Sequence, residues 1–148
     1  MSRKPQNLAG PIRKIVANAR VARLATLDAR GRPHIVPVCF AYDGKALYSA
    51  VDRKPKRVSP ERLVRLQNIR AMSRVALLID EYDEDWTRLW YVLIRGKATL
   101  VPDGAHQERA RAIRRLRAKY PQYGGEMLAD DAAIIRIIPE RTTSWGKI

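Results

Sequence analysis

The sequence predicts a mostly β protein with flanking helices, built on a six-stranded antiparallel sheet that closes into a small barrel. Short runs of apolar and β-branched residues recur along the chain, and tight turns separate several of them. The expected order of elements, β-β-β-α-β-β-α-β, is dominated by hairpins, which pair strands antiparallel. Closure into a barrel is expected because an open sheet of these strands would leave its edges exposed.

The first half of the chain is expected to contain one short helix and three strands. Pro11–Ala19 starts with a proline after a glycine and carries isoleucine and valine residues at helical spacing. Asp43-Gly44 is a strong hairpin signal between the second and third strands. Pro37 lies within the second strand and indicates an irregular sheet, because proline cannot donate to a strand ladder. The strands are expected at residues 21–27, 35–41 and 47–51.

A second helix is expected from Pro60 to Met72, directly after the third strand and a short loop. Ser59 is a good N-cap residue, and proline suits the first helical turn, where its missing N–H is not needed. The helix should bury an apolar face made of Leu63, Leu66 and Ile69. Its arginines are expected to lie off that face: Arg62, Arg65 and Arg70.

The rest of the chain is expected to add three strands and one helix. The strand at 74–80 is almost fully apolar and should be central, and the long strand at 88–101 should bulge or bend at Gly96. The last strand, 133–138, is expected to stop at Pro139. The helix at 106–120 should present an apolar line of Ala110, Ile113, Leu116 and Tyr120.

Length and composition indicate a soluble globular protein with one domain over residues 1–148, since 46% of the residues are hydrophobic and 30% are charged. No run approaches the roughly 18 apolar residues of a transmembrane helix, so no membrane association is expected. The first residues carry no apolar signal core, which favours a cytoplasmic protein. Cys39 is the only cysteine, which excludes an intrachain disulfide.

The net charge of +14 makes polyanions the expected partners, and nucleic acid is the first to consider. However, the cations are spread over a loop and two helices, and no zinc-finger spacing, basic zipper or RNA-stacking signature occurs. A polyanionic small molecule explains the charge equally well. We therefore expect no specific nucleic-acid binding.

A cationic loop follows the third strand and is the most informative stretch of the chain. Arg53, Lys54, Lys56 and Arg57 crowd into it just before the second helix begins. A helix N-terminus offers unpaired backbone N–H groups and a partial positive charge. The loop is therefore a candidate seat for a phosphate group, although an ordinary solvated loop would have a similar composition.

No set of residues announces catalysis by the protein itself. Two histidines and one cysteine do not supply the usual structural zinc site, so no metal is expected. A P-loop, a dinucleotide-binding glycine motif and a nucleophile elbow are all missing. The tryptophans offer aromatic surface instead. Trp145, near the chain end, is a candidate wall for a planar ligand or a subunit contact, as is Trp86. Trp90 could serve the same purpose or could simply pack in the core.

Several fragments, taken in order, carry a family resemblance across nearly the whole chain: residues 24–40, 54–57, 68–70, 74–80 and 85–90. Together they resemble the split-barrel flavin and deazaflavin oxidoreductases, the superfamily that includes pyridoxamine 5′-phosphate oxidase. Within it they are most similar to the subgroup that uses the deazaflavin coenzyme F420. The resemblance implies a six-stranded antiparallel split β-barrel of the FMN-binding type.

The resemblance also implies a homodimer, with the cofactor in a groove between the two barrels. Its phosphate would be held by Lys54, Lys56 and Arg57, where the residues alone had already indicated a phosphate seat. The ring system would lie along Val36, Pro37, Val38 and Ser49. Arg62 and Arg65 would reach the acidic tail of the deazaflavin, and Trp86, Trp90 or Trp145 would line the ring or substrate.

The expected function is thus hydride transfer between F420 and an unsaturated organic substrate, with no catalytic side chain, because the cofactor carries the chemistry. FMN is the main alternative cofactor, since it also carries a phosphate at the end of a ribityl chain. An alternative of another class is a non-enzymatic binding protein for a cofactor, haem or nucleic acid, supported mainly by the charge of +14.

Overall fold

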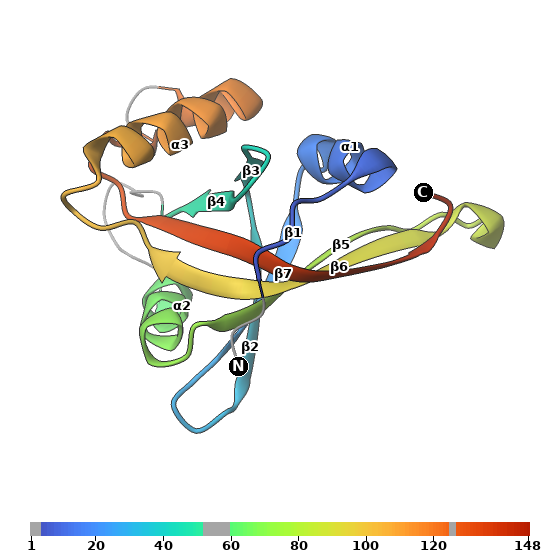
Figure 1. The fold of residues 1–148 in the computed structure, drawn as a ribbon, viewed down its shortest axis with the longest axis horizontal. Coiled ribbons are helices and arrows are strands. Elements are labelled where there is room, and N and C mark those ends of the chain that lie inside the picture. The colour runs from blue at the N-terminus through green and yellow to red at the C-terminus, as the bar shows by residue number, and fades with distance from the viewer. Residues whose placement is uncertain (1–3, 52–59, 125–126) are drawn as a thin grey trace.

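The protein forms one curled antiparallel sheet with helices around it (Figure 1). The computed structural model describes residues 4–51, 60–124 and 127–148, apart from the side chains of residues 60–63. Its seven strands follow the order β2-β1-β5-β6-β7-β4-β3. The strands are β1 (Ala22–Leu27), β2 (Pro33–Val38), β3 (Ala41–Tyr42), β4 (Leu47–Ala50), β5 (Arg74–Glu81), β6 (Trp90–Leu100) and β7 (Ile134–Gly146).

The mostly β class is confirmed, with seven strands instead of six. The additional strand arises where the predicted strand at 35–41 breaks into β2 and β3. β3 and β4 form the hairpin that Asp43-Gly44 predicted, and the Asp43 carboxylate accepts hydrogen bonds from the next turn of backbone at Lys45 and Ala46. Pro37 is accommodated because β2 lies at the sheet edge and pairs only with β1 among the described strands.

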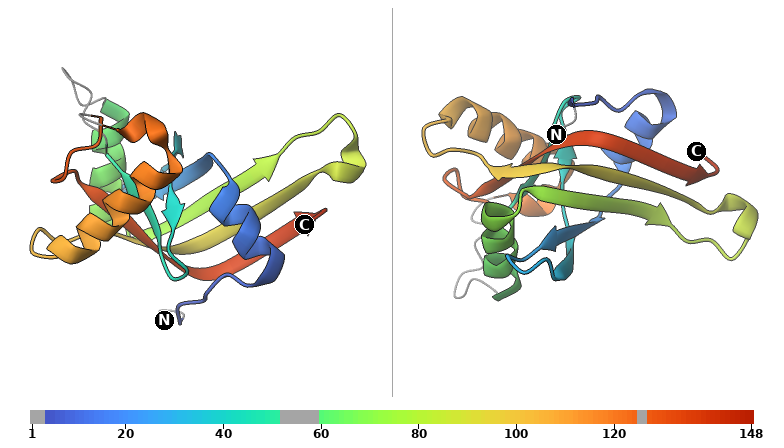
Figure 2. Two further views of the ribbon diagram at one scale, coloured as in Figure 1. Left: turned by 90° about the horizontal axis from the view of Figure 1, so that it is seen from above. Right: turned by 60° about the horizontal axis from the view of Figure 1, so that its bottom comes forward.

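The inner face of the curled sheet holds the hydrophobic core. Leu24, Leu77, Ile79, Val92 and Ile94, which come from β1, β5 and β6, are at most 1% exposed. A second buried cluster lies between β4, β7 and the C-terminal helix α3 (His106–Lys119). Figure 2 shows how β5, β6 and β7 extend together beyond the other strands as an arm, with the short helix η1 (Trp86–Arg88) at its end.

The bulge predicted at Gly96 is confirmed. The register between β6 and β7 shifts between Arg95 and Gly96, and a Cβ at Gly96 would collide with the Ile138 carbonyl oxygen. The predicted end of the last strand at Pro139 is wrong, because β7 continues to Gly146. Pro139 lies opposite Gly96 at the bulge, where the ladder is already interrupted and its missing N–H is tolerated. The chain beyond Pro139 can therefore pair along the whole arm.

Three α-helices and a second short helix, η2 (Pro121–Tyr123), surround the sheet. α1 (Gly10–Asn18) buries Val16 and packs Ile12 and Ile15 against the first core cluster, as its spacing predicted. α3 buries Ala112 in place of the predicted Ala110, which is exposed, alongside Ile113 and Leu116. None of the helices in the described part of the chain is long and apolar enough to cross a membrane.

The middle helix, α2 (Pro60–Ala71), packs against β1 and β6. It buries Ile69 as predicted, but also Arg65, which is only 5% exposed, and Asn68. The expectation that Arg65 lies off the buried face is therefore wrong. Asn68 donates a hydrogen bond from Nδ2 to the buried Thr26 Oγ1 at 3.0 Å, so polar groups tie α2 to β1.

Candidate functional site

The outer face of the sheet carries an apolar cavity of about 720 Å³. Ile35 on β2 is 64% exposed and Leu78 on β5 is 36% exposed, although both lie in strands whose alternate residues are in the core. The volume lies in the range of small-molecule sites. The cavity is lined entirely from β1, β2, β5 and β6, by Arg23, Ala25, Ile35, Ala76, Leu78, Asp80, Tyr91 and Leu93.

One ion pair lies at this cavity. Arg23 Nη1 is 2.9 Å from Asp80 Oδ1, and both side chains are nearly half exposed. An exposed pair of this kind contributes little to stability. Its guanidinium and carboxylate are instead the charged groups available to orient a ligand whose remaining contacts here are apolar.

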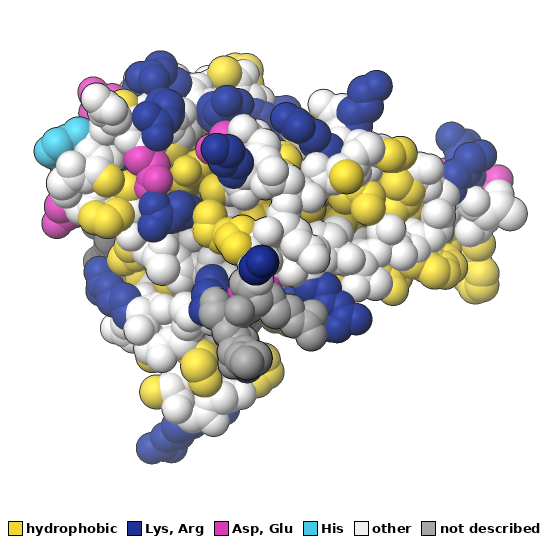
Figure 3. All heavy atoms as spheres, viewed as in Figure 1, with side chains coloured by type: hydrophobic (Ala, Val, Ile, Leu, Met, Phe, Trp, Pro, Cys, Tyr) yellow, Lys and Arg dark blue, Asp and Glu magenta, His cyan; other side chains and the backbone are white. Residues whose placement is uncertain are grey.

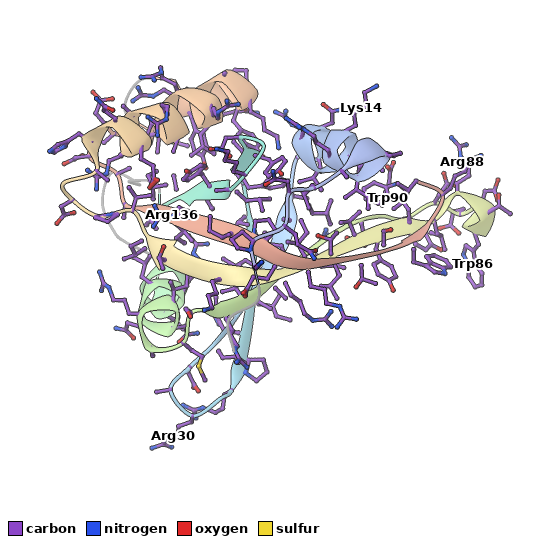
Figure 4. All side chains as sticks on the ribbon, viewed as in Figure 1. Lys14, Arg30, Trp86, Arg88, Trp90 and Arg136 are labelled. Atoms are coloured by element: carbon purple, nitrogen blue, oxygen red, sulfur yellow. The ribbon has the colours of Figure 1, made fainter. Side chains whose placement is uncertain are left out.

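An aromatic cluster borders the cavity along the arm. The rings of Tyr91 and Trp145 are stacked, with centroids 6.0 Å apart and an interplanar angle of 21°. Tyr82, Tyr91 and Trp145 also line an adjoining cavity of about 210 Å³. Trp86, at the end of the arm in Figure 4, is 71% exposed and donates from Nε1 to the Tyr82 hydroxyl at 3.4 Å. Flat aromatic surface is thus exposed on the arm next to the cavity.

The loop that carries Trp86 is held by a local hydrogen-bond pattern. Asp85 Oδ1 accepts hydrogen bonds from Thr87 Oγ1 at 2.7 Å and from the Thr87 backbone N–H at 3.1 Å. These bonds favour the ionised carboxylate and hold the pKa of Asp85 below its usual range. Asp85 therefore caps η1, and its negative charge stabilises the conformation of this loop.

The three tryptophans occupy different surroundings. Trp145 is 53% exposed on the outer face, as expected of an aromatic wall, and Trp86 is exposed at the end of the arm. Trp90 is half-buried against the first core cluster, as expected if this residue packs in the core. Trp90 also lines a separate cavity of about 550 Å³ beside α1, together with Lys14 and Glu81. Figure 4 shows Trp90 on the α1 side of the sheet and Trp86 at the far end of the arm.

The residues predicted to contact the ring are divided between the two faces. Pro37 is exposed and Val36 half-buried, whereas Val38 and Ser49 are 5% and 2% exposed. Val38 belongs to the first core cluster. Of these four positions, Pro37 therefore presents the most side-chain surface to an external ligand.

The residues predicted to hold the phosphate, Lys54, Lys56 and Arg57, lie outside the described residues. Arg62 is in α2, and its side chain is also outside the described part. Arg65 is buried and makes interactions within the protein. The cationic loop joins β4 to α2, and α2 packs on β1, a strand of the cavity.

Sequence reasoning did not identify Ile35, Leu78, Tyr91 and Leu93 as site residues. Residues 75–79 and 92–94 are apolar on both faces of their strands, so the alternation that separates inside from outside is missing. The only signal available in the sequence was the excess of apolar residues at positions that would otherwise face solvent. A strand with a solvated outer face would place polar residues at 35 and 78.

Comparison with known proteins gives this geometry a context. The family model for pyridoxamine 5′-phosphate oxidase matches residues 8–146. A 5a,11a-dehydrotetracycline/5a,11a-dehydrooxytetracycline reductase from Streptomyces rimosus is 30% identical over 127 residues, covering 84% of this chain and 72% of the reductase.

Solved structures of other proteins share the fold. A FAD-binding protein from Mesorhizobium loti has a TM-score of 0.69 and 23% identity, covering 94% of this chain and 95% of its own. An F420 reductase has a TM-score of 0.65 and 24% identity, covering 92% and 98%. The split barrel expected from the sequence is thereby confirmed, and this chain belongs to the pyridoxamine 5′-phosphate oxidase family of oxidoreductases.

Proposed function

We propose that this protein is a homodimeric oxidoreductase that transfers a hydride between coenzyme F420 and an unsaturated, fused-ring organic substrate. The observation that carries the proposal is the apolar cavity on the outer face of the sheet, lined from four strands. A flat ring system suits this surface, because Ala25, Ile35, Leu78 and Leu93 offer apolar contact with a single adjacent ion pair.

The proposed contacts match the two parts of a flavin or deazaflavin, a flat ring system and a phosphate. The cavity takes the ring, and Lys54, Lys56 and Arg57 are the cations proposed to hold its phosphate. The bound cofactor supplies hydride transfer at its ring. The chain supplies orientation and exclusion of water: apolar side chains cover the ring, and the Arg23–Asp80 pair fixes one edge of a ligand by charge and hydrogen bonding.

The homodimer follows from the same face. Ile35, Leu78 and Trp145 would stay in contact with water in a single copy, although they line two adjoining cavities that share Leu78 and Tyr91. Contiguous exposed apolar surface of this kind marks an interaction site. A second copy of the chain would cover it and would close the cavity from the other side, as expected for a cofactor held between two barrels.

The substrate class rests on the aromatic cluster and on the relative that acts on dehydrotetracyclines. Stacked aromatic side chains bind flat rings well, and Tyr91 and Trp145 lie at one end of the cavity. F420 is ranked above FMN because the excess positive charge of +14 matches an anionic tail. A FAD-binding protein among the structural neighbours keeps the flavin alternative in the test.

The deciding experiment titrates the purified protein with F420 and with FMN, followed by quenching of tryptophan fluorescence. We expect F420 to bind in the micromolar range or tighter, and FMN more weakly, since fewer of its groups are charged. Ile35→Glu should abolish binding of both, because it places a charge in the cavity. Met127→Glu, a matched change at another exposed apolar residue, should leave binding unchanged. Tighter binding of FMN would reverse the cofactor assignment, and full affinity of Ile35→Glu would move the ring site elsewhere.

A further inference from the structure

A further cavity lies beside helix α3, on the opposite side of the molecule from the arm (Figure 1). Its volume is about 440 Å³, and one stripe of the helix forms its wall. The stripe includes Arg109, Ile113 and Arg117, which are spaced four residues apart and therefore share one side of the helix. Asp130, from the segment after η2, lies across from them.

The two arginines at the ends of this stripe are held rigidly. The Arg109 side chain is 11% exposed, and its terminal nitrogens donate to the backbone carbonyl oxygens of Pro102 at 3.1 Å and Asp103 at 3.3 Å. Arg117 Nη2 donates to the Leu128 carbonyl oxygen, and its Nη1 is 3.1 Å from Asp130 Oδ1. Guanidinium groups fixed in this way lose little rotamer freedom when they bind a ligand.

One hydrogen-bond donor of each guanidinium group is nevertheless unused by the part of the chain that the structure describes. The Nε atoms of Arg109 and Arg117 are buried and have no hydrogen-bond partner within the described residues. A buried donor without a partner is costly, so the surroundings of these two side chains are not fully satisfied within the described residues. Both arginines line the cavity, and a ligand there would meet their terminal nitrogens.

The charges around the cavity indicate which kind of ligand would bind there. Arg114 is an exposed member of the same wall, and His106 stands at its N-terminal end. Asp130 is the one carboxylate of the lining, and its side chain is 91% exposed. A second carboxylate, Asp103 Oδ1, lies 3.6 Å from Arg109 Nη2 and is fully exposed. The acid of the first helical turn, Glu108, is instead bound to Arg136 on β7, with Nη1 to Oε2 at 2.8 Å. Figure 3 shows Lys and Arg side chains gathered over α3.

The spacing of the arginines specifies the length of the ligand. Eight residues separate Arg109 from Arg117, which corresponds to about 12 Å along the helix axis. The two guanidinium groups are held by different segments, Arg109 by Pro102 and Asp103 and Arg117 by Leu128 and Asp130, so a ligand that contacts both would use two anionic groups. We propose that the cavity beside α3 binds an elongated small molecule with two or more phosphate groups, such as a nucleoside diphosphate, at a site separate from the outer face of the sheet. Ala110 and Ile113 supply the apolar part of the wall for its organic portion.

Calorimetric titration of the full chain with ADP, at about 150 mM salt to screen loose surface binding, tests the proposal. Adenosine and pyrophosphate serve as separate probes. Equal affinity for pyrophosphate and ADP would mean that the site recognises an inorganic diphosphate. Binding of ADP but not of pyrophosphate would mean that it recognises a nucleotide. Adenosine should not bind. Saturable binding of neither phosphate compound would overturn the proposal.

Variants on one helix separate the cavity from diffuse charge. Arg114→Ala should weaken ADP binding about tenfold, as expected for loss of a charged hydrogen bond. Arg115→Ala removes the same charge from an exposed neighbour that does not line the cavity, and should change affinity less than about twofold. Asp130→Asn should strengthen binding, because it removes the opposing carboxylate. Equal weakening by Arg114→Ala and Arg115→Ala, with similar binding of a short oligonucleotide, would mean a non-specific polyanion surface instead. Loss of ADP binding in Lys56→Ala would assign the anion to the cationic loop, and would also overturn the proposal.

Discussion

The two faces of the curled sheet have similar amino acids and different surroundings. On the inner face, Leu24, Leu77 and Ile94 are completely buried under the helices and the opposite strands. On the outer face, Ile35 and Leu78 remain exposed beside a cavity of about 720 Å³. Leu77 and Leu78 are consecutive residues of β5, so the contrast does not depend on the local sequence.

The difference shows which apolar residues the fold itself requires. Removing the inner residues from water accounts for the folding of one chain. The outer residues have no such role within the described chain, and their exposure is unfavourable unless something binds there. This contrast supports the proposal that the outer face binds a cofactor and a second copy, and the comparison of the two faces provides the tests below.

The largest effect is expected from truncation on the inner face. Leu77→Ala should lower the free energy of unfolding by about 2–5 kcal/mol, because it leaves a cavity in the closed core. Leu78→Ala, the matched change on the outer face, should cost less than about 1 kcal/mol at low protein concentration and more at high concentration, since the proposed second copy would cover this side chain. Urea denaturation at two protein concentrations measures both. Equal costs at every concentration would remove the distinction between the faces.

The next effect concerns the cations proposed to serve the outer face. Lys56→Ala should weaken binding of F420 and FMN by one to two orders of magnitude, because a hydrogen bond to a charged group is worth roughly 1.5–3 kcal/mol. Lys45→Ala, an exposed lysine in the β3–β4 turn, is the control and should bind normally. Unchanged affinity in a folded Lys56→Ala protein would place the phosphate elsewhere.

The smallest effect concerns Lys119, a half-buried cation at the end of α3. Lys119 Nζ lies 3.9 Å from the centre of the Phe40 ring, has no hydrogen-bond partner among the described residues, and is near Arg20. Burial, and secondarily the charge of Arg20, lowers the pKa of Lys119 from 10.5 to about 8.

The unfolded chain therefore binds more protons than the native one between these values, and stability should rise with pH from about 8 toward 10. Lys119→Met should flatten this rise, measured as the difference in thermal midpoint between variant and parent at pH 7 and 9.5. The window stops there because burial raises the pKa of Tyr120, which would reverse the slope at higher pH. The same slope in both proteins would show that Lys119 is not the group responsible.

Local signals in the sequence predicted much of the fold. The Asp43-Gly44 turn and the helix starting at Pro60 follow from the conformational limits of one or two residues, and Gly96 marked the position of the bulge. The end of the last strand at Pro139 was predicted wrongly because a proline is harmless where a bulge in the neighbouring strand already interrupts the ladder. That bulge is a property of two strands far apart in the chain.

The site was harder to predict than the fold. The cationic loop was recognisable because charge clusters are visible in a sequence, but the side that Ile35 and Leu78 occupy depends on which strands pair and how the sheet curls. Arg65 was expected at the surface from its charge, and its burial depends on the packing of α2 against β1 and β6. Tertiary packing, which periodicity alone does not specify, decided both.

The central claim is that the outer face binds a second copy of the chain around the cofactor. Light scattering at micromolar concentration tests it most directly. We expect a mass near twice 16.9 kDa for the parent protein and a mass near 16.9 kDa for Leu78→Glu, which places a charge on that face. Circular dichroism should show that the variant is folded, because Leu78 makes no part of the inner core. A parent protein that stays near 16.9 kDa while binding F420 tightly would contradict the account.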